Sequence, residues 1–527
     1  MHLNQSLMRA VALWPEREAI ADGQKKMNYE ELGKRVAALI AALSEAGVKK
    51  GDVIACMTLN CHEYLELYYA ASFMAAVLNP LNYRLKTEEI RAILKDSDAK
   101  IFVGHTEFGQ QIKAVFDSGA PTVKQILWLG AGTPPALSTD SQKYEPFLMS
   151  KWGASLPEPV ATSDDLAQLY YTSGTTGTAK GVMLTQMNAA FNALGAVSEL
   201  NIRDSDVWLH VAPMFHLVDA WAIWAITWAG GKHVFLPQFK PTEVMQAIER
   251  EHVTMTALVP TMLNTLLEAH NVWEYTYNSL RYVLTAGSPV APELVRQVAE
   301  VFRCDYAQFY GMTETSPFLT ISIPMDSHKN LPEHKLLELK AKTGRPFIGV
   351  DVRVVDPDGN EVRRNNEDVG EIIARGPNVT KGYWNKPEIT ADTIKDGWIY
   401  TGDLAVVDND GYLNIVDRKK DMIITGGENV YSTEVEHVLY EHPAVFECAI
   451  FGIPDEKWGE SIKAVIVRHG KIEATEDDII DFVKQRLAHY KAPKSVEFVD
   501  ELPKTGSGKI FKKALRDKYW ENLVKKV

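Results

Sequence analysis

The sequence contains little cysteine, and its cysteines do not form pairs. They are Cys56, Cys61, Cys304 and Cys448. None belongs to a CxxC pair, and the few histidines do not stand at metal-ligand spacing around them. A structural zinc site and a disulfide framework are therefore disfavoured, and a reducing cytoplasmic location fits the composition.

Basic residues are also fewer than acidic ones. The chain has 56 lysines and arginines against 69 acidic residues, a formal net charge of −13. An acidic chain of this kind disfavours broad binding to nucleic acid or to an anionic membrane surface.

Long hydrophobic runs are absent as well. The most apolar stretch, residues 218–231, contains Asp219 and Thr227. It falls short of the roughly 20 apolar residues that cross a bilayer, so a buried element is expected rather than an integral membrane segment. The N-terminal residues lack the sustained apolar core of a signal peptide.

The length of 527 residues is more than one hydrophobic core accommodates, so two or more domains are expected. Residues 29–46 carry apolar side chains at helical spacing, with Asn28 placed to cap the helix. Short apolar runs at residues 53–57, 100–103 and 281–285 predict buried strands. Strands separated by helical stretches predict α/β layers with a largely parallel sheet.

The sequence pattern changes at Gly344. Residues 350–355, 370–374 and 411–416 predict strands, and Asp358-Gly359 is a hairpin signal, so a small β-rich subdomain is expected. Beyond residues 417–421 the pattern returns to mixed α/β, with helices at 434–440 and 477–487 and a strand at 464–467. We place a domain boundary near Lys420, between residues 1–419 and 420–527.

The segment Tyr170-Tyr-Thr-Ser-Gly-Thr-Thr-Gly-Thr-Ala-Lys-Gly181 combines three glycines, five serine or threonine hydroxyls and one lysine. Glycine permits turns that point several backbone N–H groups at an anion, and the hydroxyls and Lys180 add donors. This composition suits a triphosphate, and a flexible turn is the alternative. A Walker P-loop is disfavoured, because Gly181 follows the lysine where that motif has serine or threonine.

A second segment is Gln308-Phe-Tyr-Gly-Met-Thr-Glu-Thr315. Gly311 permits a sharp turn, Thr313 offers a hydroxyl, and Glu314 offers a hard oxygen ligand suited to Mg²⁺. A strand followed by a polar turn is the alternative interpretation.

Three more segments carry functional groups. Asp403 follows a glycine turn in Tyr400-Thr-Gly-Asp403, where a carboxylate can accept hydrogen bonds from both ribose hydroxyls. Arg418 adds a cation in Asp417-Arg418.

The segment Leu502-Pro-Lys-Thr-Gly-Ser-Gly-Lys-Ile510 has two glycines and ends near Lys509. Its first residues match a sortase signal, but no hydrophobic segment follows; a solvated basic tail is the other alternative.

In this order the five segments resemble the AMP-forming adenylating superfamily: acyl-CoA synthetases, peptide-synthetase adenylation domains and luciferases. The resemblance covers nearly the whole chain and is closest to medium-chain and aryl acyl-CoA synthetases. Two positions depart from the family pattern: Ala179 stands where proline is usual, and Gln186 where histidine is common.

The resemblance implies an α/β fold with a large N-terminal domain of layered subdomains, a small β-rich subdomain, and a smaller, mobile α+β C-terminal domain that rotates about the hinge Lys420. It also implies an ATP site. The residues that would bind ATP are Thr172, Ser173, Gly174, Thr175, Thr176, Gly177 and Lys180 at the phosphates, Gly287, Ser288 and Pro289 at the adenine, Gln308, Phe309, Tyr310, Gly311, Met312 and Thr313 in the second segment, Asp403 at the ribose, and Arg418 at the ribose or a phosphate.

By the same resemblance, Glu314 binds Mg²⁺ and Lys509 reaches the α-phosphate and the substrate carboxylate. Gly426 and Gly427 leave room for the pantetheine of coenzyme A. Residues 213–221 match the segment that lines the acyl pocket, with His216 as its gate or wall and Trp221 as the best candidate for its floor. Most of the nearby tryptophans are expected in the core.

The expected function is ATP-dependent activation of a carboxylic acid to acyl-AMP, with release of pyrophosphate, followed by transfer of the acyl group to coenzyme A. A bulky pocket floor favours a short-chain, medium-chain or aromatic acid. A long-chain fatty acid CoA ligase, an enzyme that loads a carrier protein, and a luciferase-like monooxygenase stay open as alternatives. The C-terminal Val-Lys-Lys-Val counts against the luciferase, because it is not a peroxisomal address. The oligomeric state, including a homodimer, is left open.

Overall fold

The computed structural model describes residues 1–119, 122–172, 179–455, 457–470, 472–504 and 510–524. The chain divides into two compact units, and each is described separately below. Unit 1 comprises Met1–Val352 and Ala374–Ile399, and unit 2 comprises Arg353–Ile373 and Tyr400–Val527. Among the described residues, no helix is both long enough and apolar enough to cross a bilayer.

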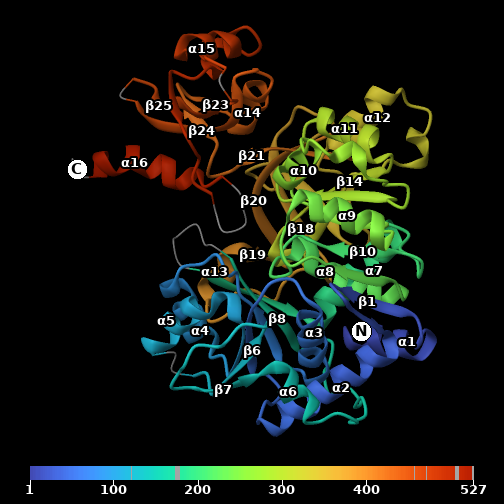
Figure 1. The fold of residues 1–527 in the computed structure, drawn as a ribbon. Coiled ribbons are helices and arrows are strands. Elements are labelled where there is room, and N and C mark those ends of the chain that lie inside the picture. The colour runs from blue at the N-terminus through green and yellow to red at the C-terminus, as the bar shows by residue number, and fades with distance from the viewer. Residues whose placement is uncertain (120–121, 173–178, 456, 471, 505–509, 525–527) are drawn as a thin grey trace. The chain divides into compact units, whose positions relative to one another are not determined.

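Two large sheets form the framework of unit 1 (Figure 1). One has the order β16-β15-β14-β13-β12-β10-β11-β1-β2. Its strands are β1 (Glu18–Asp22), β2 (Lys25–Asn28), β10 (Val207–His210), β11 (Lys232–Phe235), β12 (Met255–Leu258), β13 (Tyr282–Ala286), β14 (Asp305–Gly311), β15 (Phe318–Ile321) and β16 (Arg345–Pro346). The pairs from β1 through β14 in this order are parallel, which confirms the predicted sheet type.

The other large sheet has the order β7-β6-β5-β3-β4-β8-β9. Its strands are β3 (Val53–Met57), β4 (Val77–Pro80), β5 (Ile101–His105), β6 (Gln125–Leu129), β7 (Asp140–Lys143), β8 (Leu166–Thr172) and β9 (Lys180–Thr185). Its pairs are parallel except β8 with β9, which are antiparallel.

Successive residues of a strand point to opposite faces of its sheet, so each sheet has two apolar faces to bury. Helices cover both faces. In β13, Leu284 belongs to the large central core and Val283 to the core under α9, α10 and α11. In β3, Ile54 faces the central core and Ala55 the core under α4 and α5. The helices of unit 1 are α1 (Asn4–Leu13), α2 (Tyr29–Glu45), α3 (His62–Met74), α4 (Thr87–Ser97), α5 (Gly109–Asp117), α6 (Tyr144–Met149), α7 (Gln186–Glu199), α8 (Leu217–Ala229), α9 (Pro241–Glu251), α10 (Pro260–Leu267), α11 (Pro292–Phe302), α12 (Glu333–Ala341) and α13 (Pro387–Thr393).

A third sheet contains the strands predicted after Gly344. Its strands are β17 (Asp351–Val355), β18 (Gly370–Arg375), β19 (Ile394–Lys395), β20 (Trp398–Val407) and β21 (Leu413–Arg418). The predicted strand at 411–416 begins two residues later, because Gly411 has a positive φ of 84° within the turn that precedes it.

The remaining part of unit 2 is a sheet between helices. Its strands are β22 (Ile423–Thr425), β23 (Glu428–Val430), β24 (Val445–Asp455), β25 (Gly459–Arg468) and β26 (Ser495–Val499), and its helices are α14 (Ser432–Tyr440), α15 (Glu476–Lys484) and α16 (Lys512–Val524). In β24, Ile450 packs in the core of α14 and α15, whereas Phe451 packs in the core that includes Leu515 of α16. The predicted α+β character of this region is confirmed.

Local sequence signals account for several boundaries. The Asn28 side chain accepts a hydrogen bond from the Glu31 backbone and caps α2 as predicted. The most apolar stretch of the sequence forms the buried helix α8, which ends at Gly230 with a left-handed φ of 80°.

Candidate active site

Residues 170–181, the first of the two segments predicted to contact the ATP phosphates and called here the first phosphate segment, join two paired strands. β8 and β9 are antiparallel, and Thr172 pairs with Lys180, so both residues flank the intervening loop. Ser173, Gly174, Thr175, Thr176 and Gly177 lie outside the described residues, and their assignment to ATP stays a prediction.

The outer side of β9 is covered by residues 380–384. The Met183 backbone donates to the Gly382 carbonyl at 3.0 Å, and the Trp384 backbone donates to the Gly181 carbonyl at 2.7 Å. The Lys180 ammonium lies 5.2 Å from the centre of the Tyr383 ring, within reach of a cation–π interaction. Residues 380–384 therefore form part of the surroundings of the first phosphate segment.

The second segment is built on β14 and on the short 3₁₀ turn η3 (Thr313–Thr315) that follows it. Glu314 in this turn is nearly buried, with 7% of its surface exposed. Its Oε1 atom accepts a hydrogen bond of 2.8 Å from the Tyr383 hydroxyl, and its backbone carbonyl accepts one of 2.7 Å from the Thr380 backbone. Thr313, the neighbouring candidate, is half-buried.

The buried side chains of Asn378 and Ser316 fix the turn around Glu314. The Asn378 side chain donates to the Thr315 and Phe318 carbonyls at 2.9 and 2.8 Å, and the Ser316 hydroxyl donates to the Asn378 carbonyl at 2.8 Å. Gly311 is required here for space, since a Cβ at this position would lie 1.8 Å from the Pro317 carbonyl oxygen.

The adenine segment lies beside the second segment because β13 and β14 are parallel neighbours. Gly287 follows β13 with a positive φ of 97°. The Gln308 side-chain amide donates to the Ser288 carbonyl at 3.3 Å. Gly287, Ser288 and Pro289 are exposed, whereas Tyr310, Gly311 and Met312 are half-buried.

The candidate acyl segment leads into α8. His216 is the N-cap residue of this helix. Trp221 is 2% exposed, and its ring packs edge-on against Trp208, Phe309 and Phe318, with centroids 4.9, 6.1 and 5.0 Å away. Trp221 thus lies in the core against Phe309 of the second segment. Its role as a pocket floor, like that of His216 as a gate, stays a prediction.

Asp219 anchors α8 through a polar chain that the sequence did not reveal. This buried carboxylate accepts a hydrogen bond of 3.1 Å from the Trp208 indole, and its other oxygen lies 2.5 Å from His210 Nδ1. The chain continues from His210 to His233 at 2.9 Å and from His233 to Thr227 at 2.9 Å. Burial lowers the pKa of His233 well below its ordinary value. The polar interruption of the apolar stretch at Asp219 was the only sequence signal of this network.

In unit 2, Asp403 and Arg418 are Cα partners on β20 and β21, and Arg418 Nε lies 3.1 Å from Asp403 Oδ1. The two predicted ribose residues are therefore brought together.

The predicted hinge and the coenzyme A turn also lie in unit 2. The Lys420 carbonyl accepts a hydrogen bond of 2.9 Å from Arg516 of α16, and burial lowers the pKa of the Lys420 ammonium. Gly426 and Gly427 form the two-residue turn between β22 and β23, with positive φ values of 63° and 86°. Lys509 lies outside the described residues.

The family model for the AMP-binding enzyme matches residues 7–384, and the model for the AMP-binding enzyme C-terminal domain matches residues 434–509. The chain belongs to the AMP-binding enzyme family. The resemblance to the AMP-forming adenylating superfamily is thereby confirmed. The domain boundary near Lys420 and the individual site residues stay predictions.

Relatives of this family member align over almost the whole chain. A feruloyl-CoA synthase from Amycolatopsis sp is 37% identical over 514 residues, which cover 97% of this chain and 98% of the relative. A 4-hydroxybutyrate–CoA ligase 2 from Metallosphaera sedula is 33% identical over 518 residues, which cover 97% and 93%.

Two solved structures share the fold. ATP-bound MatB from Rhodopseudomonas palustris superposes with a TM-score of 0.85 at 32% identity, covering 98% of this chain and 99% of that chain. The o-succinylbenzoate CoA synthetase from Bacillus subtilis, in complex with its acyl-adenylate intermediate, gives 0.83 at 31% identity, covering 97% and 98%. The predicted fold class is confirmed.

This member of the family is an AMP-forming acid–thiol ligase that uses ATP and coenzyme A. It activates a carboxylic acid by adenylation and transfers the acyl group to coenzyme A. The predicted enzyme class is confirmed.

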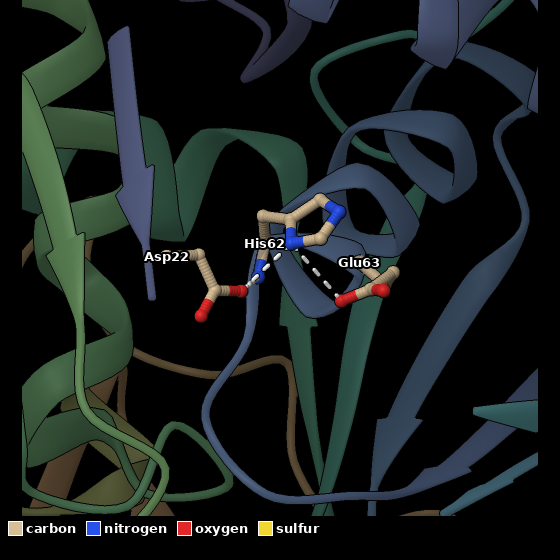
Figure 2. Close-up of side chains that lie close together, drawn as sticks. All are labelled: Asp22, His62 and Glu63. Atoms are coloured by element: carbon tan, nitrogen blue, oxygen red, sulfur yellow. Dashed lines mark hydrogen bonds and ion pairs between the residues drawn. The ribbon is translucent and has the colours of Figure 1, made fainter. Parts of the chain in front are cut away.

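One further cluster of side chains has the composition of a metal site. Among the described residues, Asp22, His62 and Glu63 place ligand atoms within 4.8 Å of one another. Figure 2 shows both carboxylates directed at His62 Nδ1, at 2.7 Å for Asp22 and 3.2 Å for Glu63. The Lys25 ammonium, 2.9 Å from Nε2, can only donate, so Nδ1 carries the proton given to Asp22. Both ring nitrogens are engaged within the cluster, which joins β1 to the start of α3.

Proposed function

We propose that the acid activated by this enzyme is a compact, planar aryl carboxylic acid. The observation that carries the proposal is an aromatic layer against the second segment. Phe309, a member of that segment, stacks on Phe318 with ring centroids 4.0 Å apart. Trp221 of α8 packs edge-on against both rings. All three rings are nearly buried, so they form a rigid aromatic layer behind the segment.

Such a layer favours flat, short substrates over extended ones. Trp221 is packed on all sides, so an alkyl chain extending in its direction would have to displace it. Similarity to a feruloyl-CoA synthase and to an o-succinylbenzoate CoA synthetase supports an aryl acid, and similarity to a 4-hydroxybutyrate–CoA ligase supports a short one.

For the first half-reaction, we assign the triphosphate to residues 172–180, the adenine to Gly287–Pro289 and the ribose to Asp403 and Arg418. Lys509 would neutralise the substrate carboxylate and the α-phosphate. A carboxylate oxygen attacks the α-phosphorus, the bond to the β-phosphate breaks, and pyrophosphate leaves. Positioning and charge neutralisation supply most of the catalysis, with no protein nucleophile.

Glu314 fits the part of a Mg²⁺ ligand. A hard cation prefers oxygen ligands, and this carboxylate is held in one orientation by Tyr383. When bound, Mg²⁺ would neutralise phosphate charge beside the turn.

For the second half-reaction, we assign the pantetheine to the Gly426-Gly427 turn. The thiolate attacks the acyl carbonyl carbon, the bond to the AMP oxygen breaks, and AMP leaves. We propose residues 1–419 and 420–527 as the domains that rotate about Lys420 between the two steps.

The free cysteines support a cytoplasmic location. A homodimer is a proposal that light scattering would test; every assigned residue comes from one chain.

The test is a pyrophosphate-release screen with and without coenzyme A. The acids would be ferulate, benzoate, 2-succinylbenzoate, 4-hydroxybutyrate, octanoate and palmitate. Highest kcat/KM for an aryl acid, with an acyl-CoA product, supports the proposal. Preference for palmitate overturns the substrate class. Acyl transfer to a holo-carrier protein but not to coenzyme A, or light emission with a luciferin, would select the alternative functions.

A further inference from the structure

Tyr383 contacts a charged group from each of the two phosphate segments of unit 1. Its hydroxyl donates to Glu314 Oε1 at 2.8 Å, and the face of its ring lies 5.2 Å from the Lys180 ammonium. Tyr383 and Glu314 are only 6% and 7% exposed, so this hydrogen bond is shielded from water. Glu314 is 69 residues from Tyr383 in the sequence.

The backbone holds the tyrosine ring at a fixed place. Tyr383 forms an isolated antiparallel bridge with Val182 of β9, and its N–H donates to the Thr390 hydroxyl at 2.9 Å. The residues on either side, Gly382 and Trp384, exchange hydrogen bonds with β9. The ring therefore moves with the strand that carries Lys180.

The same segment fixes the backbone of Glu314. The Thr380 N–H donates to the Glu314 carbonyl, and the Thr380 hydroxyl donates to the Met183 carbonyl of β9 at 2.6 Å. Glu314 is thus held at its main chain and at its side chain by residues 380–384.

The phenol is a permanent donor. A phenol ordinarily keeps its proton at neutral pH, and an ionised carboxylate can only accept, so the Tyr383 hydroxyl is the donor to Glu314. A donor on one carboxylate oxygen fixes the rotation of the carboxylate. Groups that orient a metal ligand in this way affect metal affinity although they do not touch the metal.

From these contacts we infer that Tyr383 is a positioning residue that orients the Glu314 carboxylate toward the Mg²⁺ of bound ATP. The inference rests on the proposed assignment of Glu314 to Mg²⁺. It adds residues 380–384 to the site as the element that connects the two phosphate segments.

The test compares Tyr383→Phe with the wild type. Phenylalanine keeps the ring and removes only the hydroxyl. The first readout is binding of a non-hydrolysable ATP analogue, titrated by calorimetry with and without Mg²⁺. We expect the Mg²⁺-dependent part of the affinity to fall about tenfold, with little change in binding without metal. The second readout is the Mg²⁺ concentration at half-maximal adenylation rate, which should rise, while thioester formation from synthetic acyl-AMP stays unchanged.

Tyr144→Phe is the matched control. The Tyr144 hydroxyl also donates to a buried carboxylate, Glu66 Oε2, at 2.8 Å, but it belongs to α6, which contains none of the candidate site residues. It should lower the melting temperature without changing the Mg²⁺ response.

A double-mutant cycle with Glu314→Gln separates positioning from packing. If Tyr383 acts through the carboxylate, Tyr383→Phe adds little to the loss already caused by Glu314→Gln. An unchanged Mg²⁺ response in Tyr383→Phe, or fully additive losses, would overturn the inference. Because the calorimetric readout needs no acid substrate, failure to find an activated acid would affect the proposed function and not this test.

Discussion

Asp403 and Arg418 face each other across β20 and β21, with Arg418 Nε 3.1 Å from Asp403 Oδ1. Asp403 is nearly buried while the Arg418 side chain is more than half exposed, so the arginine fixes the carboxylate from the solvent side. This pair would present an oriented acceptor to the two ribose hydroxyls.

Asp403→Asn should therefore raise the KM for ATP. The amide retains the shape but loses the charge that strengthens both hydrogen bonds, a loss of about 1.5–3 kcal/mol or roughly 10- to 100-fold. The measurement is the ATP dependence of adenylation. Glu361→Gln, which breaks an exposed pair with Arg353 in the same unit, is the control and should leave this KM unchanged. An equal KM in Asp403→Asn would remove Asp403 from the ribose site.

Gly311→Ala should disrupt the turn that carries Glu314. The added Cβ would lie 1.8 Å from the Pro317 carbonyl oxygen, and this backbone contact can be relieved only by moving the turn. We expect adenylation to fall by about a hundredfold or more, since small misplacement of a positioning group has effects of that size. Gly109→Ala is the control, because its Cβ would meet only the Pro135 ring at 3.3 Å. Near-wild-type adenylation in Gly311→Ala would mean that the turn can adapt.

Trp221→Ala should change acid preference at a cost in stability. Removing a buried tryptophan destabilises a core by about 3–5 kcal/mol. If the vacated space joins the acyl pocket, each extra buried methylene gains about 0.8 kcal/mol, so kcat/KM should shift toward longer or bulkier acids.

Trp224→Ala serves as its control, because Trp224 lies on the same helix but packs against Tyr68 and Tyr69. It should lower the melting temperature without altering the rank order of acids. An unchanged rank order in Trp221→Ala as well would make Trp221 purely structural.

Lys509→Ala should abolish adenylation, by about a hundredfold or more, and spare the second half-reaction, because only the first requires a cation between two anions. Synthetic acyl-AMP with coenzyme A isolates the second step. Lys504→Ala, in the same segment but paired with Glu447 at 2.6 Å, is the control. Equal loss of both steps in Lys509→Ala would refute its assigned role.

Lys420→Pro should have the opposite effect. Proline fixes φ, so a backbone that must rotate at this residue can no longer do so. Acyl-AMP should still form while thioester formation collapses. Equal loss of both half-reactions, or of neither, would argue against rotation at Lys420.

The sequence predicted most of the secondary structure that positions the site, because capping residues and apolar runs are local signals. The α2 cap at Asn28 and the buried strand β3 follow directly from such signals. The hydrogen bond of Gln308 to Ser288 depends in addition on the pairing of β13 with β14, which the sequence did not predict.

The supporting contacts could not be predicted. Asn378 and Tyr383 carry no recognisable chemical pattern, and each reaches a partner more than 60 residues away. The Asp219–His210–His233 chain joins three elements whose adjacency arises only from sheet order. Residue spacing along the chain contains no information about such contacts.

The contact between Tyr383 and Glu314 constrains how segments can be exchanged between relatives. A crossover placed after η3 and before residue 380 would take the proposed metal ligand, Glu314, from one parent and its hydrogen-bond donor, Tyr383, from the other. Such a hybrid could fold well and still respond poorly to Mg²⁺ wherever the two parents differ in this pair. Crossovers outside residues 314–383 would inherit the pair intact, so recombination libraries offer an independent measure of how strongly the two positions depend on each other.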